Sequence, residues 1–170
     1  MQNGVSVIIA LGSNLAHQDL EPKAILDAAV IALCKRGIDQ VNQSSWWRSK
    51  AWPDPLQPSF YNGVVMGQTL LEPVLLMQLL LEIEAQFGRT RSLVHAPRPL
   101  DLDLIAYGDR IEDGPDLILP HPRAAERRFV MGPIAEIAPD WVHPVLGQTA
   151  QALFGCASIG IDAEPITPKA

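Results

Sequence analysis

The stretch VSVIIALGSN, residues 5–14, decides how the rest of the chain is interpreted. β-Branched residues fill most of its first half, and it ends in a Gly-Ser-Asn sequence that is typical of a turn. A short apolar run bounded by turn residues predicts a buried strand. A buried strand that ends at the Gly-Ser-Asn turn is therefore the first element expected in the chain.

Helix and strand signals alternate after this strand. A proline at position 22 and a glycine at position 37 bracket apolar residues at helical spacing, so a helix is predicted between them. Strands are predicted over residues 38–48, 60–70 and 100–107, with a proline-rich loop at 52–58. Further helices are predicted over residues 73–87, ending at Gly88, and over 127–137, where Pro133 should shorten or kink the helix.

This order of elements, β-α-β-β-α-β followed by a C-terminal extension, predicts the α+β class. The specific expectation is a ferredoxin-like βαββαβ core with its helices packed on one face of a mainly antiparallel sheet. No internal repeat, charge run or low-complexity linker divides the sequence. A single domain over residues 1–170 is therefore expected.

Composition restricts the possible functions. Hydrophobic residues make up 48% of the 170 residues, enough for a sizeable core. The formal net charge of −6 disfavours binding to nucleic acid or to an anionic membrane. The most apolar runs, residues 5–11 and 74–81, are far shorter than the ~18–20 residues that span a bilayer, and no signal-peptide pattern is present. We expect a soluble cytoplasmic protein in which Cys34 and Cys156 are buried thiols.

The segment RPLDLDLI, residues 98–105, is the most informative for function. Alternation along a strand places Asp101 and Asp103 on one face, with Cβ atoms roughly 6.5–7 Å apart. That spacing suits two carboxylates that share a pair of hard cations ~3.5–4 Å apart. The alternative is an ordinary amphipathic strand whose polar face is solvated.

Arginine is concentrated around these aspartates. Residues 89–128 contain seven arginines and no lysine, whereas the rest of the chain has two arginines and four lysines. The planar guanidinium group suits phosphate oxygens, so the segment indicates a site for polyphosphate and metal, unless these are simply surface arginines. No P-loop, GxGxxG, HExxH or Cys/His cluster is present, which disfavours the nucleotide-binding and zinc sites that depend on them.

A second set of residues would suit a flat heterocycle. Trp52, Phe60 and Phe129 offer aromatic faces, and Asn62 offers an amide that could read the edge of a ring. Taken singly, each aromatic residue is more often part of a core. His121 lies in a loop after Leu119-Pro120, where it could be structural or could donate to a phosphate.

Several motifs in this order resemble the 6-hydroxymethyl-7,8-dihydropterin pyrophosphokinase family of folate biosynthesis. The matching elements are ALGSNL (10–15), SSWWRS (44–49), FYN (60–62), IE (83–84), FGRTR (87–91), PRPLDLD (97–103), LPHPR (119–123) and RRF (127–129). The resemblance extends from residue 10 to about residue 144, and the combination of RPLDLD with LPHPR is its most specific part.

The resemblance implies an enzyme that transfers the β,γ-pyrophosphoryl group of ATP to the hydroxymethyl group of the pterin and releases AMP. It implies two Mg²⁺ ions as cofactors and ATP as co-substrate. Together with the charge and the lack of a targeting segment, this leads us to expect a cytoplasmic monomer without a nucleic-acid or membrane partner. It assigns metal binding and catalysis to Asp101 and Asp103, and catalysis also to Arg89 and Arg98. The residues it assigns to ATP are Glu84, Arg91, Arg98, His121 and Arg127. The residues it assigns to the pterin are Ser49, Trp52, Phe60, Asn62 and Phe129.

The chain also departs from the family pattern. His95-Ala96 stands where the best-studied members carry Trp-Gly, in the segment 89–98 that is expected to close over the substrates. The other departures are Lys50 and Ala51 in place of prolines, Pro122 in place of a tyrosine and Leu81 in place of a glutamine. The rival hypotheses are another Mg²⁺-dependent transferase on the same scaffold, an RNA-binding module, and an inactive family member.

Overall fold

The main sheet of the protein is antiparallel. The computed structural model describes residues 4–90 and 94–166. Within these residues the main sheet has the strand order β5-β1-β4-β3-β8, and β2 also pairs with β4. Its strands are β1 (Val5–Ser13), β2 (Asp39–Gln43), β3 (Trp47–Ser49), β4 (Phe60–Thr69), β5 (Asp101–Tyr107) and β8 (Glu164–Pro165). Strand β1 therefore lies between β4 and β5, at the centre of the sheet.

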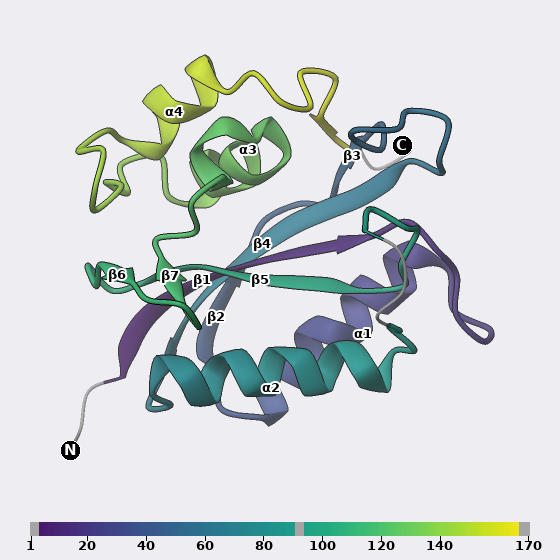
Figure 1. Ribbon diagram of the computed structural model, residues 1–170, viewed down its shortest axis with the longest axis horizontal. Helices are drawn as coiled ribbons and strands as arrows, with labels where there is room; N and C mark the ends of the chain where they lie inside the picture. Colours follow the sequence, from purple (N-terminus) through teal and green to yellow (C-terminus); the bar gives the residue numbers. More distant parts are fainter. Residues whose placement is uncertain (1–3, 91–93, 167–170) are drawn as a thin grey trace.

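The helices cover both faces of this sheet (Figure 1). Helices α1 (Pro22–Lys35) and α2 (Pro73–Gln86) pack on one face, and α3 (Arg128–Ile137) and α4 (Ala150–Cys156) lie on the other. A small hairpin of β6 (Glu112–Asp113) and β7 (Ile118–Leu119) and a 3-10 turn, Ala124–Glu126, connect β5 to α3.

The connectivity is that of two interleaved βαβ units. Strand β1 is antiparallel to both of its neighbours, β4 and β5, while α1 and α2 connect strands that are not adjacent. This is the arrangement of a ferredoxin-like core, with α1 and α2 on one face as expected. The predicted fold class is confirmed, and the C-terminal extension adds α4 on the opposite face and β8 at the edge of the sheet beside β3.

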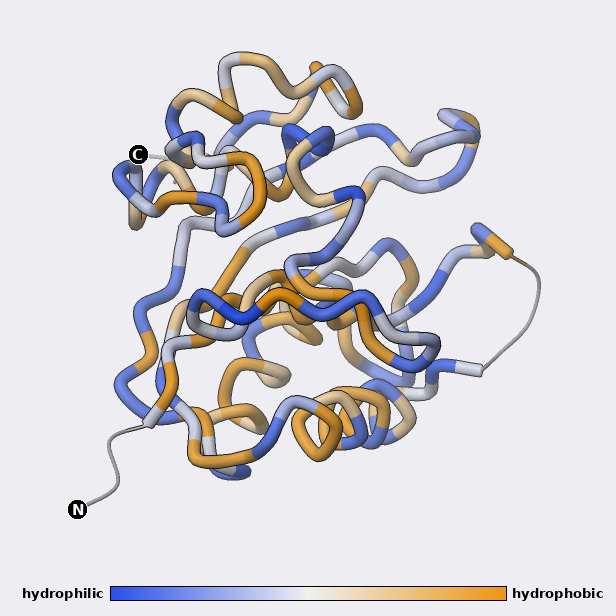
Figure 2. Tube along the Cα trace, turned by 60° about the vertical axis from the view of Figure 1, so that its left-hand side comes forward, coloured by the Kyte–Doolittle hydropathy of each residue, from blue (hydrophilic) through white to orange (hydrophobic). Residues whose placement is uncertain are grey.

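Adjacent residues of β1 contribute to two separate cores. Ile9 is buried with Leu33 and Leu80 between the sheet and helices α1 and α2. Ile8 is buried with Ile134 between the other face of the sheet and helices α3 and α4. A strand buried on both faces explains why its apolar run is continuous rather than alternating. In Figure 2 hydrophobic positions are accordingly concentrated in the strands and in the helices beneath them.

The strand predicted over residues 38–48 is interrupted. It forms β2 and β3, separated by Ser44, Ser45 and Trp46. The Ser44 hydroxyl accepts a hydrogen bond from the Val64 backbone N–H (3.0 Å), because serine competes for backbone partners through its side chain. The interruption also lets the Trp46 ring lie directly over a residue of β4, Gly63, where a Cβ atom would be only 2.5 Å from that ring.

The expectation of buried cysteines is wrong. Cys34 and Cys156 are both exposed. Cys34 follows the buried Leu33 in α1 and so points away from the core, and Cys156 is the last residue of the short helix α4. Among the described residues, every helix is too short or too polar to cross a bilayer.

Glu136 of α3 fastens that helix to the sheet. Its carboxylate accepts hydrogen bonds from the Ser45 N–H (2.7 Å), the Ser45 hydroxyl and the Trp47 indole N–H (2.8 Å). Although partial burial opposes the shift, these bonds lower the pKa of Glu136 from its usual 4.5. Their stabilisation is therefore present above about pH 4.5 and is lost as the pH falls through the lowered pKa.

Glu136→Ala is expected to reduce the free energy of unfolding by about 1–2 kcal/mol at pH 7, because hydrogen bonds to a charged acceptor are lost. Urea denaturation at pH 7 and pH 3 measures the effect, which should shrink at the lower pH. The control is Glu82→Ala, which removes an exposed pair with Arg36 and should cost less than about 0.5 kcal/mol. Equal losses in the two variants would contradict this role for Glu136.

Candidate active site

Three neighbouring strands place a carboxylate, a glycine and an amide in one row across the sheet. Gly12 of β1 pairs with Asp101 of β5 on one side and with Asn62 of β4 on the other. Residues opposite one another in a ladder point to the same face, so Asp101 and Asn62 lie about 10 Å apart, two strand spacings, with no side chain between them. Gly12 thus adds no side chain between the two polar groups, and a Cβ atom built on it would lie 3.5 Å from Asn62 Oδ1 and 3.6 Å from the Phe60 ring.

Arginines surround the first carboxylate. Asp101 Oδ1 lies 2.5 Å from Arg89 Nη1, and Asp101 Oδ2 lies 3.2 Å from Arg98 Nη2. The Arg98 guanidinium carbon also lies 5.7 Å from the centre of the Phe60 ring. Asp101 is only 22% exposed, so these charged contacts are partly shielded from water.

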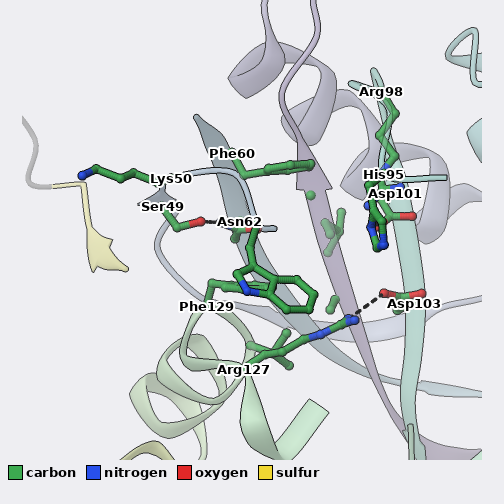
Figure 3. A pocket seen from close by; sticks show the side chains of 15 residues that line it. Ser49, Lys50, Phe60, Asn62, His95, Arg98, Asp101, Asp103, Arg127 and Phe129 are labelled. Carbon is green, nitrogen blue, oxygen red and sulfur yellow. Dashed lines mark hydrogen bonds and ion pairs between the residues drawn. The ribbon is translucent and has the colours of Figure 1, made fainter. Parts of the chain in front are cut away.

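The second carboxylate has fewer contacts. Asp103 Oδ2 lies 4.0 Å from Arg127 Nη1 (Figure 3). Burial and then the nearby charge of Asp101 raise the pKa of Asp103 from 3.8 to about 6, although the arginines oppose this rise. Within the described part of the chain, Arg98 and Arg127 each bury an Nε atom that has no hydrogen-bond partner. Donors of this kind would suit an anion between them.

Glu84 of α2 binds the backbone of β5 between the two aspartates. It is 3% exposed and accepts a hydrogen bond from the N–H of Leu102, the residue between the two aspartates (2.7 Å). It also pairs with Arg89, which thereby contacts two carboxylates. Burial raises the pKa of Glu84 from 4.5 to about 7, while the Leu102 bond and Arg89 act in the opposite direction.

His121 lines the same hollow as Arg98 and Arg127 and presents a hydrogen-bond donor there. Its Nδ1 accepts a hydrogen bond from the Arg123 N–H (3.2 Å), so the ring proton of the neutral histidine is on Nε2. Burial and then the charge of Arg127 lower the pKa of His121 below 6.5, which favours this neutral form near pH 7.

The Asn62 end of the row opens into an aromatic hollow. In Figure 3 Phe60 lies above Asn62 and Phe129 lies below it, both beside the cavity. The Asn62 amide nitrogen donates to the buried Ser49 hydroxyl (2.9 Å), which orients the amide. Trp52 is 42% exposed at the rim and lies under the Arg123 guanidinium group, 5.1 Å from its carbon.

Three hollows meet at Asp101 and Asp103. The aromatic hollow just described is the first. The second is lined by cationic and polar groups, among them Arg89, Arg98, His121 and Arg127. The third lies between α2 and β5, with walls formed by Met77, Leu81, Glu84, Ala85 and Arg89. The two aspartates therefore lie where the aromatic hollow and the arginine-lined hollow join.

The structure brings most of the predicted residues together. All five pterin candidates line the first hollow: Ser49, Trp52, Phe60, Asn62 and Phe129. Of the ATP candidates, Glu84, Arg98, His121 and Arg127 line the second or third hollow, and Arg91 lies outside the described residues. Sequence reasoning did not assign Gly12, Lys50 or His95, which also line the first hollow. The GSN turn motif was the available signal for Gly12.

Asp101 and Asp103 could hold a hard cation such as Mg²⁺ only with further ligands from water or substrate. Among the described residues no group of three or more His, Cys, Asp or Glu side chains could hold a metal ion by itself. Mg²⁺ is commonly bound by one or two carboxylates and completes its shell with water and substrate phosphates. Asp101 and Asp103, with unpartnered guanidinium nitrogens nearby, fit that pattern better than a closed metal cage.

The fold and this arrangement of carboxylates, guanidinium groups and aromatic rings are those expected of one class of protein, a transferase that acts on a polyphosphate and a flat ring. The sequence model of the 7,8-dihydro-6-hydroxymethylpterin-pyrophosphokinase (HPPK) family matches residues 8–139. The chain belongs to this family, as its motifs predicted. It is therefore an enzyme of folate biosynthesis that uses ATP to transfer pyrophosphate to the hydroxymethyl group of the dihydropterin.

Individual relatives support the assignment. The chain is 46% identical to the 2-amino-4-hydroxy-6-hydroxymethyldihydropteridine pyrophosphokinase of Synechocystis, over 84% of this chain and 71% of that protein. It is 37% identical to the enzyme of the same name from Pseudomonas aeruginosa, over 94% and 96% of the two chains. The folic acid synthesis protein fol1 of Pneumocystis carinii is 39% identical over 96% of this chain, which spans only 21% of that longer protein.

A solved structure shows the same fold. The HPPK-DHPS protein of Plasmodium falciparum, crystallised with pteroate, matches 91% of this chain with a TM-score of 0.69 at 12% identity. The chain spans less than half of that protein, 43% of its length. At this level of identity the likeness bears on the fold alone.

Proposed function

We propose that the three hollows are the pterin, polyphosphate and nucleoside parts of one active site, joined at Asp101 and Asp103. The observation that carries this proposal is the row Asp101–Gly12–Asn62, which separates a carboxylate from a ring-reading amide by about 10 Å. A pterin held edge-on by Asn62 would extend its hydroxymethyl group over Gly12 toward the aspartates.

In this proposal Asp101 and Asp103 hold two Mg²⁺ ions. Bound there, Mg²⁺ would supply positive charge to the phosphate oxygens around the reacting β-phosphorus. Arg89 and Arg98, which contact Asp101 here, are placed to exchange that carboxylate for phosphate oxygens when nucleotide binds. The hydroxymethyl oxygen then bonds to the β-phosphorus as the bond from that phosphorus to the α–β bridging oxygen breaks; AMP leaves with that oxygen, and the hydroxyl proton is released to water.

The remaining residues position the two substrates. Phe60 and Phe129 would contact the faces of the pterin, with Asn62 held by Ser49 at its edge. Arg127 and the Nε2–H of His121 would donate to the phosphates from the second hollow. Such a site works by positioning and charge neutralisation, without a covalent nucleophile.

Three broader assignments accompany this proposal. Residues 1–170 would form one domain, the enzyme would act as a cytoplasmic monomer, and ATP and the pterin would be its partners without nucleic acid or membrane. The net charge of −6 supports the last point. Arg91 and the closing segment 89–98 remain sequence-based predictions, since part of that segment lies outside the described residues.

Isothermal titration calorimetry tests the proposed site. A non-reactive ATP analogue with a methylene group between the α- and β-phosphates is titrated with and without Mg²⁺, and 6-hydroxymethylpterin is then added. We expect nucleotide binding to require Mg²⁺, and pterin to bind tightly only after the nucleotide and metal are present. Equal nucleotide affinity after chelation of all divalent metal would contradict the metal assignment.

A further inference from the structure

The segment after α4, residues 157–166, lies outside the part of the chain that matches the family and is called the C-terminal strap here. It connects the start of α3 to β3. Ile159 makes backbone hydrogen bonds with the residues on either side of Arg127. Its N–H donates to the carbonyl of Glu126 (2.9 Å), and its carbonyl accepts from the N–H of Arg128 (2.8 Å). Farther along, β8 pairs with β3, and Ile166 N–H donates to the carbonyl of Trp46 (2.8 Å).

The strap directly supports one aromatic wall of the first hollow. Gly160 has a positive φ of +71°, and a Cβ atom built on it would lie 2.4 Å from Cδ1 of the Phe129 ring. Both its conformation and its contact therefore require glycine. Any larger residue must displace the Phe129 ring, and that ring faces the hollow.

The strap also contacts a second part of the hollow, next to Ser49. The Asp162 carboxylate accepts a hydrogen bond from the Lys50 backbone N–H (2.7 Å). Lys50 lines the hollow and directly follows Ser49, whose hydroxyl accepts the hydrogen bond from Asn62. One strap thus contacts the residues that set both the aromatic face and the amide edge of the hollow.

We infer that the C-terminal strap is a positioning element that sets the affinity of the enzyme for the pterin. Gly160 fixes the ring of Phe129, and Asp162 fixes the backbone that carries Ser49 and Lys50. This inference rests on the proposed placement of the pterin between Phe60 and Phe129. Ile159 of the strap pairs with Arg127, which lines the arginine-lined hollow, whereas Gly160 and Asp162 do not line that hollow. Substitutions at Gly160 and Asp162 should therefore affect the pterin and spare the nucleotide.

Gly160→Ala tests the first contact. We expect the KM and Kd for the pterin to rise roughly tenfold, the size of a lost aromatic contact, while kcat and the affinity for the ATP analogue stay within about twofold. The matched control is Gly147→Ala, which has the same class of backbone, φ +65°, but has no atom within 4 Å of its built Cβ. Backbone strain alone would affect both variants similarly.

Asp162 provides a second test that does not depend on crowding at Gly160. Asp162→Ala removes the acceptor for Lys50 N–H and should weaken the pterin about fivefold, whereas Asp162→Asn keeps an acceptor oxygen and should restore wild-type affinity. The comparison of these two variants decides the question even if Gly160→Ala does not fold.

Phe129→Ala separates the inference from the proposed function. If this variant binds pterin as tightly as the wild type, the placement of the pterin is wrong and the inference falls with it. If Phe129→Ala weakens the pterin but the Gly160 and Asp162 variants do not, only the strap inference is overturned. It is also overturned if those variants weaken pterin and ATP analogue equally, which is the signature of a general loss of structure.

Discussion

Asp101→Ala and Asp103→Ala are each expected to slow pyrophosphoryl transfer by a thousandfold or more, an order of magnitude typical for the loss of charge stabilisation in a transition state. Each substitution removes one of the two side-chain carboxylates available to the metal ions. The fold should survive, because Asp101 and Asp103 are partly exposed and stand beside one another with like charge. We expect the free energy of unfolding to change by less than about 1 kcal/mol.

The measurement is steady-state release of AMP, with circular dichroism and urea denaturation to confirm folding. Asp109→Ala serves as the control, since Asp109 is exposed in the turn just after the other end of β5. It should have wild-type activity. Turnover near the wild-type rate in either active-site variant would show that the aspartates do not hold the catalytic metal.

Asn62→Ala is expected to weaken the pterin about a hundredfold while leaving the affinity for the Mg²⁺-bound ATP analogue within about twofold. Asn62 is 5% exposed and is oriented by Ser49, so its amide is prepared to pair with the ring edge at little entropic cost. Its loss leaves polar atoms of the pterin buried without partners.

Calorimetric titration of each ligand separately measures this difference. Asn42→Ala is the control, because Asn42 is an exposed residue of β2 that lies away from the hollow. Equal weakening of both ligands would indicate a general loss of structure. Unchanged pterin affinity would favour a different flat substrate, or another Mg²⁺-dependent transferase reaction on this scaffold.

The core elements could be predicted because their signals are local. Residues 22–35 and 73–86 have prolines at their starts and glycines beyond their ends, and both form helices. Gly37 and Gly88 have positive φ, as their places after those helices require. The break at Ser44–Trp46 was missed because it depends on a contact with Gly63 of a strand that comes later in the chain.

Some features of the candidate site likewise follow from the local sequence, whereas others depend on contacts between distant parts of the chain. The shared face of Asp101 and Asp103 follows from strand alternation, which needs only the local sequence. The row through Gly12 to Asn62 depends on the register of three strands, and the bond from Leu102 to Glu84 depends on the packing of α2. Neither the row of Asp101, Gly12 and Asn62 nor the bond from Leu102 to Glu84 can be predicted from a periodicity in the sequence.

The C-terminal strap had no sequence signal at all. Gly160 and Asp162 belong to no motif, and their importance arises only from contacts with residues more than 30 positions earlier in the chain. Long-range support of this kind becomes visible only when the fold is known. A glycine with positive φ under an aromatic ring is then the feature that identifies it.

Asp101 and Asp103 are expected to bind divalent metal together with the phosphates of ATP. A crystal structure with Mn²⁺, the methylene ATP analogue and 6-hydroxymethylpterin tests this claim, because Mn²⁺ can be located by anomalous scattering. We predict anomalous peaks within coordinating distance of both carboxylates and of the phosphate oxygens. Peaks bound to phosphate alone, with both aspartates still paired to arginine, would contradict the claim.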